Sequence, residues 1–156
     1  MLKKFLIVMG VIATGFIASC SLLLGFSAVN EAPKNKALAE AITRDLARGW
    51  NVSDIQPYFP NNGVEQVNFA AAQASFNPLK PLGRLQRIEK AQQTAFAMEK
   101  NLGDWLTKTA TVIMVASFEH GHANVTMELR SEAGQMKLRS VNVTPVDGVP
   151  AKGQPA

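Results

Sequence analysis

Two histidines on either side of one glycine, His120-Gly121-His122, are the only histidine pair in the chain. Two imidazoles can share a metal ion, but structural and catalytic zinc sites need three or four ligands. The chain has no third histidine, and its single cysteine, Cys20, lies far away in an apolar segment. We therefore interpret the pair as exposed turn residues and predict neither a metal nor another cofactor.

Three carboxylates are the candidates for acid–base catalysis: Asp45, Asp54 and Glu89. Such catalysis needs a side chain within hydrogen-bond reach of the reacting atoms, with its pKa tuned by its neighbours. The three are scattered along the chain without a recognisable pairing. Asp45 is the strongest candidate, because it follows Ile42 by three residues and falls beside an apolar helical stripe. Each is also explained as a rim, solvated or helix-start charge, so no catalytic residue is assigned and the protein is predicted not to be an enzyme.

Basic side chains collect in the C-terminal part of the chain. Lys137 and Arg139 are two residues apart, so on a strand they share one face, opposite Met136 and Leu138. The simplest interpretation is a solvated outer face of a sheet. The alternative is a weak surface for anionic lipid or an acidic partner, since a few spaced charges attract only modestly. These basic residues include Arg84, Arg87, Lys90, Lys100, Arg130, Lys137 and Arg139.

The overall charge argues against nucleic acid as a partner. The chain has 16 basic and 12 acidic side chains, for a net charge of +4. Lys3 and Lys4 belong to an N-terminal leader, and subtracting them leaves 14 basic against 12 acidic side chains. A nearly balanced domain lacks the basic footprint that binds nucleic acid. Because no cysteine follows Cys20, the domain is stabilised by packing and not by disulfides.

Residues 5–29 carry no charge and directly follow Lys3 and Lys4. A helix of this length crosses the roughly 30 Å hydrocarbon core of a bilayer, at about 1.5 Å per residue. The two lysines favour a cytoplasmic N-terminus. The leader, residues 1–29, therefore predicts a protein of the bacterial cell envelope, held at the membrane with its C-terminal domain in the periplasm or outside the cell.

Three kinds of processing remain open for the leader. Ile17-Ala-Ser-Cys20 resembles the lipobox of bacterial lipoproteins, which implies lipidation at Cys20. After Cys20 the chain stays apolar as far as Val29, and an uncleaved signal anchor explains this continuation better. Ordinary cleavage after Ser27 is the third alternative. The intact mass of the protein extracted from membranes distinguishes them.

Helices are predicted first in the exported part. Residues 30–35 are a polar segment interpreted as a short stalk. A helix is predicted over 36–48, because Leu38, Ile42 and Leu46 repeat every four residues, with Gly49 as its end. Further helical segments are predicted from a capping box at Ser53 and over residues 64–75, before a rigid Pro-rich connector over 77–83.

Strands dominate the second half. Residues 84–98 alternate weakly and fit an edge strand or a helix. Residues 109–118, 123–130 and 135–143 are rich in β-branched or alternating residues and predict a three-stranded antiparallel meander. The exported domain, residues 36–145, is thus predicted to be α+β, with helices on one face of a curved antiparallel sheet, and residues 146–156 to be a disordered tail.

The segment from Phe118 to Leu138 resembles the final hairpin of cystatin-like and NTF2-like domains. It has an alternating strand, a polar turn ending in Gly134, and a Gln-x-Lys-apolar strand in which Met136 stands where tryptophan is common. Leu82-Gly83 ahead of a strand is also similar. The resemblance implies helices packed on a curved sheet around a cone-shaped space. It implies no activity, because such families include enzymes, binders and scaffolds.

The sequence therefore favours a membrane-tethered envelope protein with a non-enzymatic binding or scaffolding role and an envelope protein as partner. The alternative is a carrier or sensor of a small apolar ligand in a cone-shaped pocket. A filled core with an exposed patch favours the first function, and an open apolar cavity the second. Most of the large aromatic residues are expected in the core: Trp50, Tyr58, Phe59, Phe69, Phe76 and Trp105.

Overall fold

The computed structural model describes residues 30–60, 68–101 and 104–146. The chain divides into two compact units, Met1–Pro33 and Lys34–Ala156, and the fold given below is that of the second. Within the described ranges, no helix is long and apolar enough to span a bilayer. The apolar leader with Cys20 and most of the predicted tail lie outside those ranges, so what the sequence predicts for them stays a prediction.

The first helix of this unit covers residues 34–46, and the predicted apolar stripe lies on its buried face. Ile42 and Leu46 are completely buried, and Leu38 packs against them at the edge of the core. Residues 30–35, which were predicted to form a short stalk, are helical as well. The four-residue repeat therefore identified the correct face of the helix.

The helix ends in a turn in which Trp50, and not Gly49, has the left-handed conformation, with φ of 55°. A residue with a Cβ is strained in that conformation. Its side chain offsets the strain, because it is only 3% exposed and its Nε1 donates to the carbonyl oxygen of Gly83 at 2.9 Å. The ring also lies 5.4 Å from that of Phe118. Trp50 thus links the end of the helix to the residues at the start of the sheet by a hydrogen bond and a ring contact.

Short helical segments connect this helix to the sheet. The predicted capping box at Ser53 is wrong, because Asn51 precedes the first segment and Ser53 lies inside it. Asn68 caps the next helix by accepting a hydrogen bond from the backbone N of Ala71 at 3.0 Å. The segments are α2 (Val52–Ile55), the 3-10 turn η1 (Gln56–Tyr58), α3 (Phe69–Phe76) and the 3-10 turn η2 (Asn77–Leu82).

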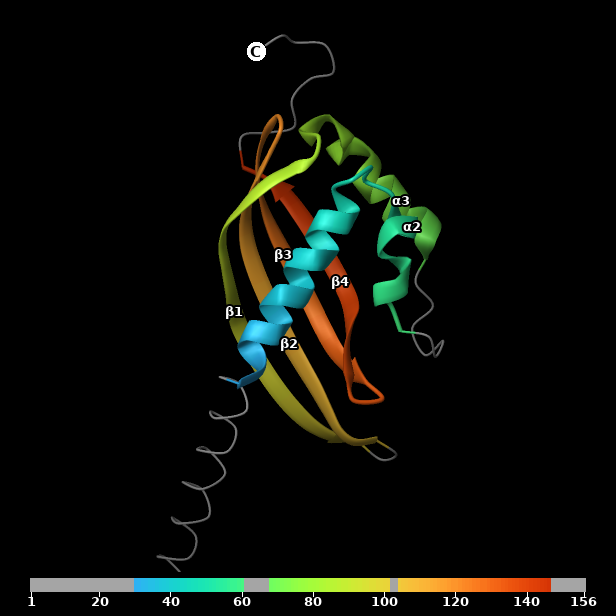
Figure 1. The fold of residues 1–156 in the computed structure, drawn as a ribbon. Helices are drawn as coiled ribbons and strands as arrows, with labels where there is room; N and C mark the ends of the chain where they lie inside the picture. The colour runs from blue at the N-terminus through green and yellow to red at the C-terminus, as the bar shows by residue number, and fades with distance from the viewer. Residues whose placement is uncertain (1–29, 61–67, 102–103, 147–156) are drawn as a thin grey trace, which may run out of the picture. The chain divides into compact units, whose positions relative to one another are not determined.

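Four antiparallel strands follow and pair in chain order: β1 (Leu85–Asn101), β2 (Asp104–Phe118), β3 (Gly121–Glu132) and β4 (Gln135–Pro145). Figure 1 shows the helix of residues 34–46 lying across the concave face of this curved sheet. The α+β class and the predicted meander are confirmed. The ambiguous segment 84–98 is a strand, and it forms one edge of the sheet.

Bulges in β1 explain why its sequence pattern was ambiguous. Leu85, Ile88 and Ala91 pack against the core and are three residues apart, a spacing that also fits a helix. The register with β2 shifts between Leu85 and Arg87 and again between Ile88 and Lys90, so each step contains one extra residue. An added residue lengthens the apolar repeat from two to three without turning the side chains to the other face.

The central strands alternate strictly between core and solvent. On β2 the even-numbered residues from Ala110 to Phe118 are buried, and on β3 the odd-numbered residues from Ala123 to Leu129 are buried. Their neighbours in sequence point away from helix 34–46 and form what we call the outer sheet face. Of the large aromatic residues, Trp50, Phe59 and Phe76 are buried, whereas Phe69 is 38% exposed. The side chain of Trp105 lies outside the description.

Candidate functional site

The concave side of the sheet, where the resemblance implied a cone-shaped space, is filled by side chains. Ile42 of the helix, Met114 of β2 and Met127 of β3 are all completely buried. Leu79 and Leu82 of η2 close the core at the end where the helix stops. Among the described residues, this side is therefore occupied by core side chains.

Asp45 has a structural partner. The hydroxyl of Tyr58 donates to Asp45 Oδ2 at 2.6 Å, and Arg48 Nη2 lies 3.1 Å from Asp45 Oδ1. The pKa of Tyr58 is raised above its ordinary value of 10.0, first because its hydroxyl donates to this carboxylate and second because it is partly buried. The contact fixes η1 against helix 34–46. The hydroxyl of Tyr58 stays protonated and acts as the donor. Asp45, the strongest candidate for acid–base catalysis, therefore has a structural role in this contact.

Asp54 and Glu89, the other two candidates, lie on different elements. Asp54 is exposed in the first turn of α2, where a negative charge suits the helix N-terminus. Glu89 lies on β1, in one of its bulges. The structure does not bring the three carboxylates into one site, so they do not form a catalytic pair.

Glu89 is the centre of a polar cluster on the outer sheet face. Its Oε1 accepts from the Ser117 hydroxyl at 2.5 Å and from Arg87 Nη2 at 3.3 Å, and it lies 3.6 Å from His122 Nε2. The pKa of Glu89 is lowered, first by the hydrogen bond from Ser117 and then by that from Arg87. His122 therefore lies on β3 beside a carboxylate, whereas His120 is exposed in the β2–β3 turn. No group of three metal-binding side chains occurs among the described residues.

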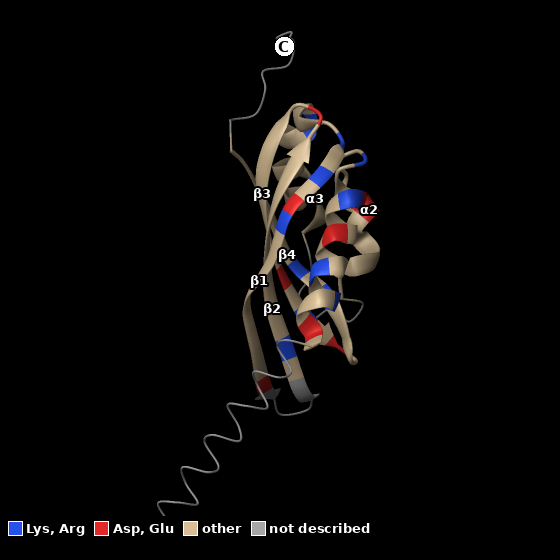
Figure 2. Ribbon diagram, turned by 60° about the vertical axis from the view of Figure 1, so that its left-hand side comes forward, with Lys and Arg blue, Asp and Glu red and all other residues tan. Residues whose placement is uncertain are grey.

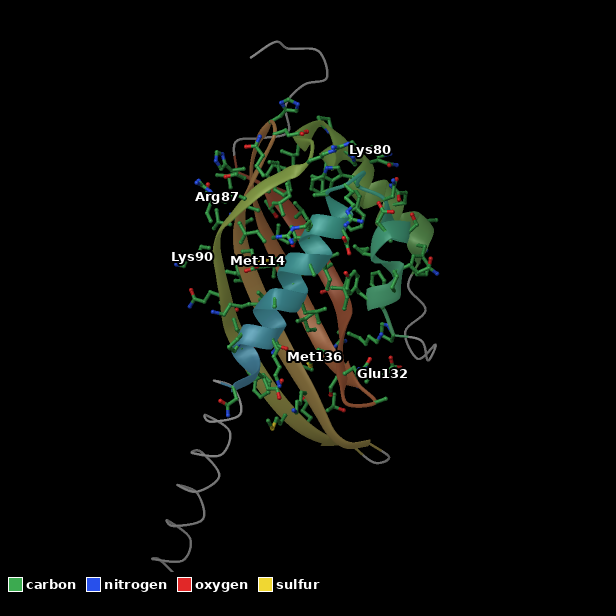
Figure 3. All side chains as sticks on the ribbon, in the orientation of Figure 1. Lys80, Arg87, Lys90, Met114, Glu132 and Met136 are labelled. Atoms are coloured by element: carbon green, nitrogen blue, oxygen red, sulfur yellow. The ribbon has the colours of Figure 1, made fainter. Side chains whose placement is uncertain are left out.

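The basic residues do not form a continuous positive surface. Arg87 is paired with Glu89, and Lys137 reaches over to donate to the carbonyl oxygen of Pro57 at 3.4 Å. Figure 2 shows the positions of basic and acidic residues interspersed along the described part of the ribbon. Figure 3 shows Arg87 and Lys90 extending from β1 away from the helix. An evenly mixed face favours a polar partner over an anionic membrane surface.

The middle of the outer sheet face is uncharged. Ile113 is 39% exposed there, although it lies at the centre of the sheet. Its cross-strand neighbours are Gln92 on β1 and Thr126 on β3, and Thr126 is in turn opposite Asn142 on β4. A single exposed aliphatic side chain is common on protein surfaces, and what distinguishes this row is that Ile113 has only uncharged cross-strand neighbours.

Next to this row the outer face contains a hollow of about 270 Å³. The side chains on its floor are short: Thr109 and Thr111 on β2 lie beside Ala97 and Ala95 on β1. Long charged side chains surround this floor. The lining residues are Glu99, Thr109, Ala110, Thr111, Glu128, Leu129, Arg130 and Arg139.

A bulge on β4 shapes one wall of the hollow. Glu128 pairs with Ser140 and Leu129 pairs with Leu138, so Arg139 is the extra residue. Bulges bend a strand and redirect side chains. The sequence contained a sign of this bulge, because the core-facing residues of β4 change from even to odd positions after Leu138 and continue at Val141. The sequence analysis did not identify it, and the hollow was missed for that reason.

Comparisons with protein-family models, with curated proteins and with solved structures find no match to this chain. The geometry of the outer sheet face is therefore the basis for the functional interpretation.

Proposed function

We propose that this chain is a non-enzymatic binding or scaffolding protein of the bacterial cell envelope, tethered to the membrane through residues 5–29. The partner is an envelope protein that contacts the uncharged row of the outer sheet face, which contains Ile113 and Thr126. The proposal includes a cystatin-like or NTF2-like fold, which agrees with a helix packed on a curved four-stranded meander. The observation that carries it is the exposed Ile113 in an uncharged row, on the face of the sheet that the helix leaves open.

The face is a better contact surface than the free edge of β1. The register of β1 shifts at four places, including between Gln93 and Ala95 and between Glu99 and Asn101. Bulges twist an edge strand away from regular pairing and are a common protection against strand addition. The outer face has strict alternation on β2 and β3 and offers a regular surface.

The alternative of an apolar-ligand carrier has less support in the described ranges, because core side chains lie between the helix and the sheet. Ile42 and Leu46 of the helix belong to one buried core cluster with Val112 and Val125 of the sheet. Opening this space exposes several aliphatic side chains, each of which contributes roughly 1.5–3 kcal/mol by burial. A binding surface that already exists requires no such rearrangement.

In-cell photocrosslinking of the tagged full-length protein tests the proposal. A photoreactive amino acid at Ile113 or Thr126 is expected to give one discrete adduct with an envelope protein, identified by mass spectrometry. The matched control position is Ala74, which is exposed on α3 and not on the outer face. Adducts of equal yield from Ala74, or none from either outer-face position, contradict a partner on this face.

A further inference from the structure

We propose that the hollow on the outer sheet face binds a small zwitterion, a molecule with one ammonium and one carboxylate group such as a dipeptide. The hollow is adjacent to the row that contains Ile113, but its chemistry differs from that of the uncharged row. The inference goes beyond the proposed function, because it assigns a small-molecule site to residues that the partner surface does not use.

The charge of the lining selects this class of ligand. The two negative charges of Glu99 and Glu128 balance the two positive charges of Arg130 and Arg139, so the four side chains have no net charge. A simple anion meets two carboxylates there, and a simple cation meets two guanidinium groups. A neutral molecule with separated charges satisfies both pairs, because guanidinium binds carboxylate in a bidentate manner and carboxylate accepts from ammonium.

The positions of these residues on the sheet orient the ligand. Glu99 lies on edge strand β1 and Arg139 on the opposite edge strand β4, whereas Glu128 and Arg130 both lie on β3. Glu99 is therefore the charge at the β1 edge and Arg139 the charge at the β4 edge, with Glu128 and Arg130 between them on β3. Strands are about 4.8 Å apart, so the edges are separated by about 14 Å, a distance that long side chains shorten from both ends. An ammonium group is expected toward Glu99 and a carboxylate toward Arg139.

The size of the hollow fits a small molecule. About 270 Å³ is far more than a single ion needs and lies just below the usual range for small-molecule pockets, roughly 300–1,000 Å³. The hydroxyl groups of Thr109 and Thr111 lie on its floor, where they can donate to or accept from a peptide group between the two charges. A dipeptide, whose two residues span at most about 7 Å, matches this arrangement.

The bulge at Arg139 is the second observation that supports a site. Arg139 is the extra residue between Leu138 and Ser140, and it adds a long basic side chain to the wall of the hollow. Bulges recur next to binding and active sites because they redirect side chains. Arg130 and Arg139 already interact with other groups of the chain. Each guanidinium has five N–H donors, so a ligand carboxylate can share them.

Titration calorimetry with three matched probes tests this inference on the full chain in detergent. Alanyl-alanine carries both charges, its N-acetyl form lacks the ammonium, and its amide lacks the carboxylate. Saturable binding of alanyl-alanine is expected, with at least tenfold weaker binding of each blocked probe. Absence of saturable binding, or equal binding of all three probes, overturns the inference.

Variants locate the binding site. Arg139→Gln is expected to weaken alanyl-alanine binding at least fivefold, and Glu99→Gln to do the same through the ammonium. The matched control is Arg44→Gln on the exposed side of helix 34–46, which should bind as wild type does. All three residues are exposed, so circular dichroism should show an unchanged fold. Wild-type affinity in Arg139→Gln contradicts the site.

Crosslinking from Ile113 is scored separately and reports on the partner protein alone.

Discussion

At the scale of single residues, the hydrogen bond from Tyr58 to Asp45 is the contact with the clearest energetic consequence. Replacing Tyr58 by Phe removes the donor but keeps the ring. We expect the free energy of unfolding to fall by about 1 kcal/mol, less than for a fully buried charged pair, because both side chains are partly exposed. Urea denaturation at neutral pH measures the difference, and an unchanged midpoint contradicts it.

The same variant has a defined pH dependence. The pKa of Tyr58 in the folded state lies above 10.0, so folding favours the protonated hydroxyl. The stability that wild type has over Tyr58→Phe is therefore fully present below the unfolded pKa and is lost as pH rises through the folded pKa. Denaturation curves on both sides of this range check the sign. If the stability of wild type relative to Tyr58→Phe increases as pH rises through this range, the mechanism is contradicted.

Glu89 has the opposite pH dependence. Its pKa is lowered by the hydrogen bonds from Ser117 and Arg87, so its contribution to stability exists above the ordinary value of 4.5 and disappears as pH falls through the folded pKa. Glu89→Gln should therefore differ most from wild type near neutral pH and least in acid. Thermal denaturation over a pH series measures this convergence, with Ser117→Ala expected to show part of the same trend.

Asp45 also shows which residue-scale features follow from sequence. Its position beside the stripe of Ile42 and Leu46 was predictable, because helical periodicity fixes the face of each residue. Its partner was not, because Tyr58 reaches it only after the turn at Trp50 and the segments α2 and η1 have taken their conformations. Local periodicity determines which side of a helix or strand a residue lies on. Contacts between residues separated by irregular segments depend on the whole fold.

At the scale of elements, the bulges of β1 carry the most specific prediction. Thr94 is the extra residue between Gln93 and Ala95, and Phe96 faces the core two residues later. Deleting Thr94 leaves a regular alternation with Phe96 still on the core side. The variant should fold, but its straightened edge should self-associate more than wild type does. Sedimentation velocity in detergent measures this.

The matched control for this deletion is Thr94→Ala, which keeps the chain length and therefore the bulge. It should show the same association state as wild type. If the deletion variant and Thr94→Ala are indistinguishable from wild type in sedimentation, the bulge has no protective role at this edge.

The predictability of the strands depended on their regularity. β2 and β3 alternate strictly between buried and outer-face residues, and their predicted ranges lie within the observed strands. β1 and β4 contain bulges, which interrupt the period of two that identifies a strand. The hollow depends on the bulge at Arg139, and this explains why the meander was predictable and the hollow was not.

At the scale of the whole molecule, a substitution on the outer sheet face should reduce partner binding without reducing the stability of the fold. Ile113 is 39% exposed, so Ile113→Lys should change the free energy of unfolding by about 0.5 kcal/mol or less, while partner capture falls at least tenfold. Phe69→Lys on α3 is the control, because Phe69 is similarly exposed but lies on another element. Quantitative capture from crosslinked cells provides the measurement. Equal capture by both variants is incompatible with a partner on this face.

The attachment to the membrane is tested by the intact mass of the extracted protein. An uncleaved anchor predicts a mass that includes all residues from Met1. A diacylated species beginning at Cys20 indicates a lipoprotein, and a shorter species without lipid that begins after Ser27 indicates ordinary cleavage. Each mass excludes the other two forms of attachment, and the outer-face proposal requires one of the first two.

The order of elements along the chain also has a consequence for synthesis and export. Helix 34–46 emerges first, but Ile42 and Leu46 are buried only when the strands that cover them, β2 and β3, have followed. At a synthesis rate of about 5–20 residues per second, the intervening chain takes several seconds to emerge. During this interval the apolar stripe of the helix is open to other apolar surfaces. The core of this domain therefore closes late in synthesis, after the last strands have emerged.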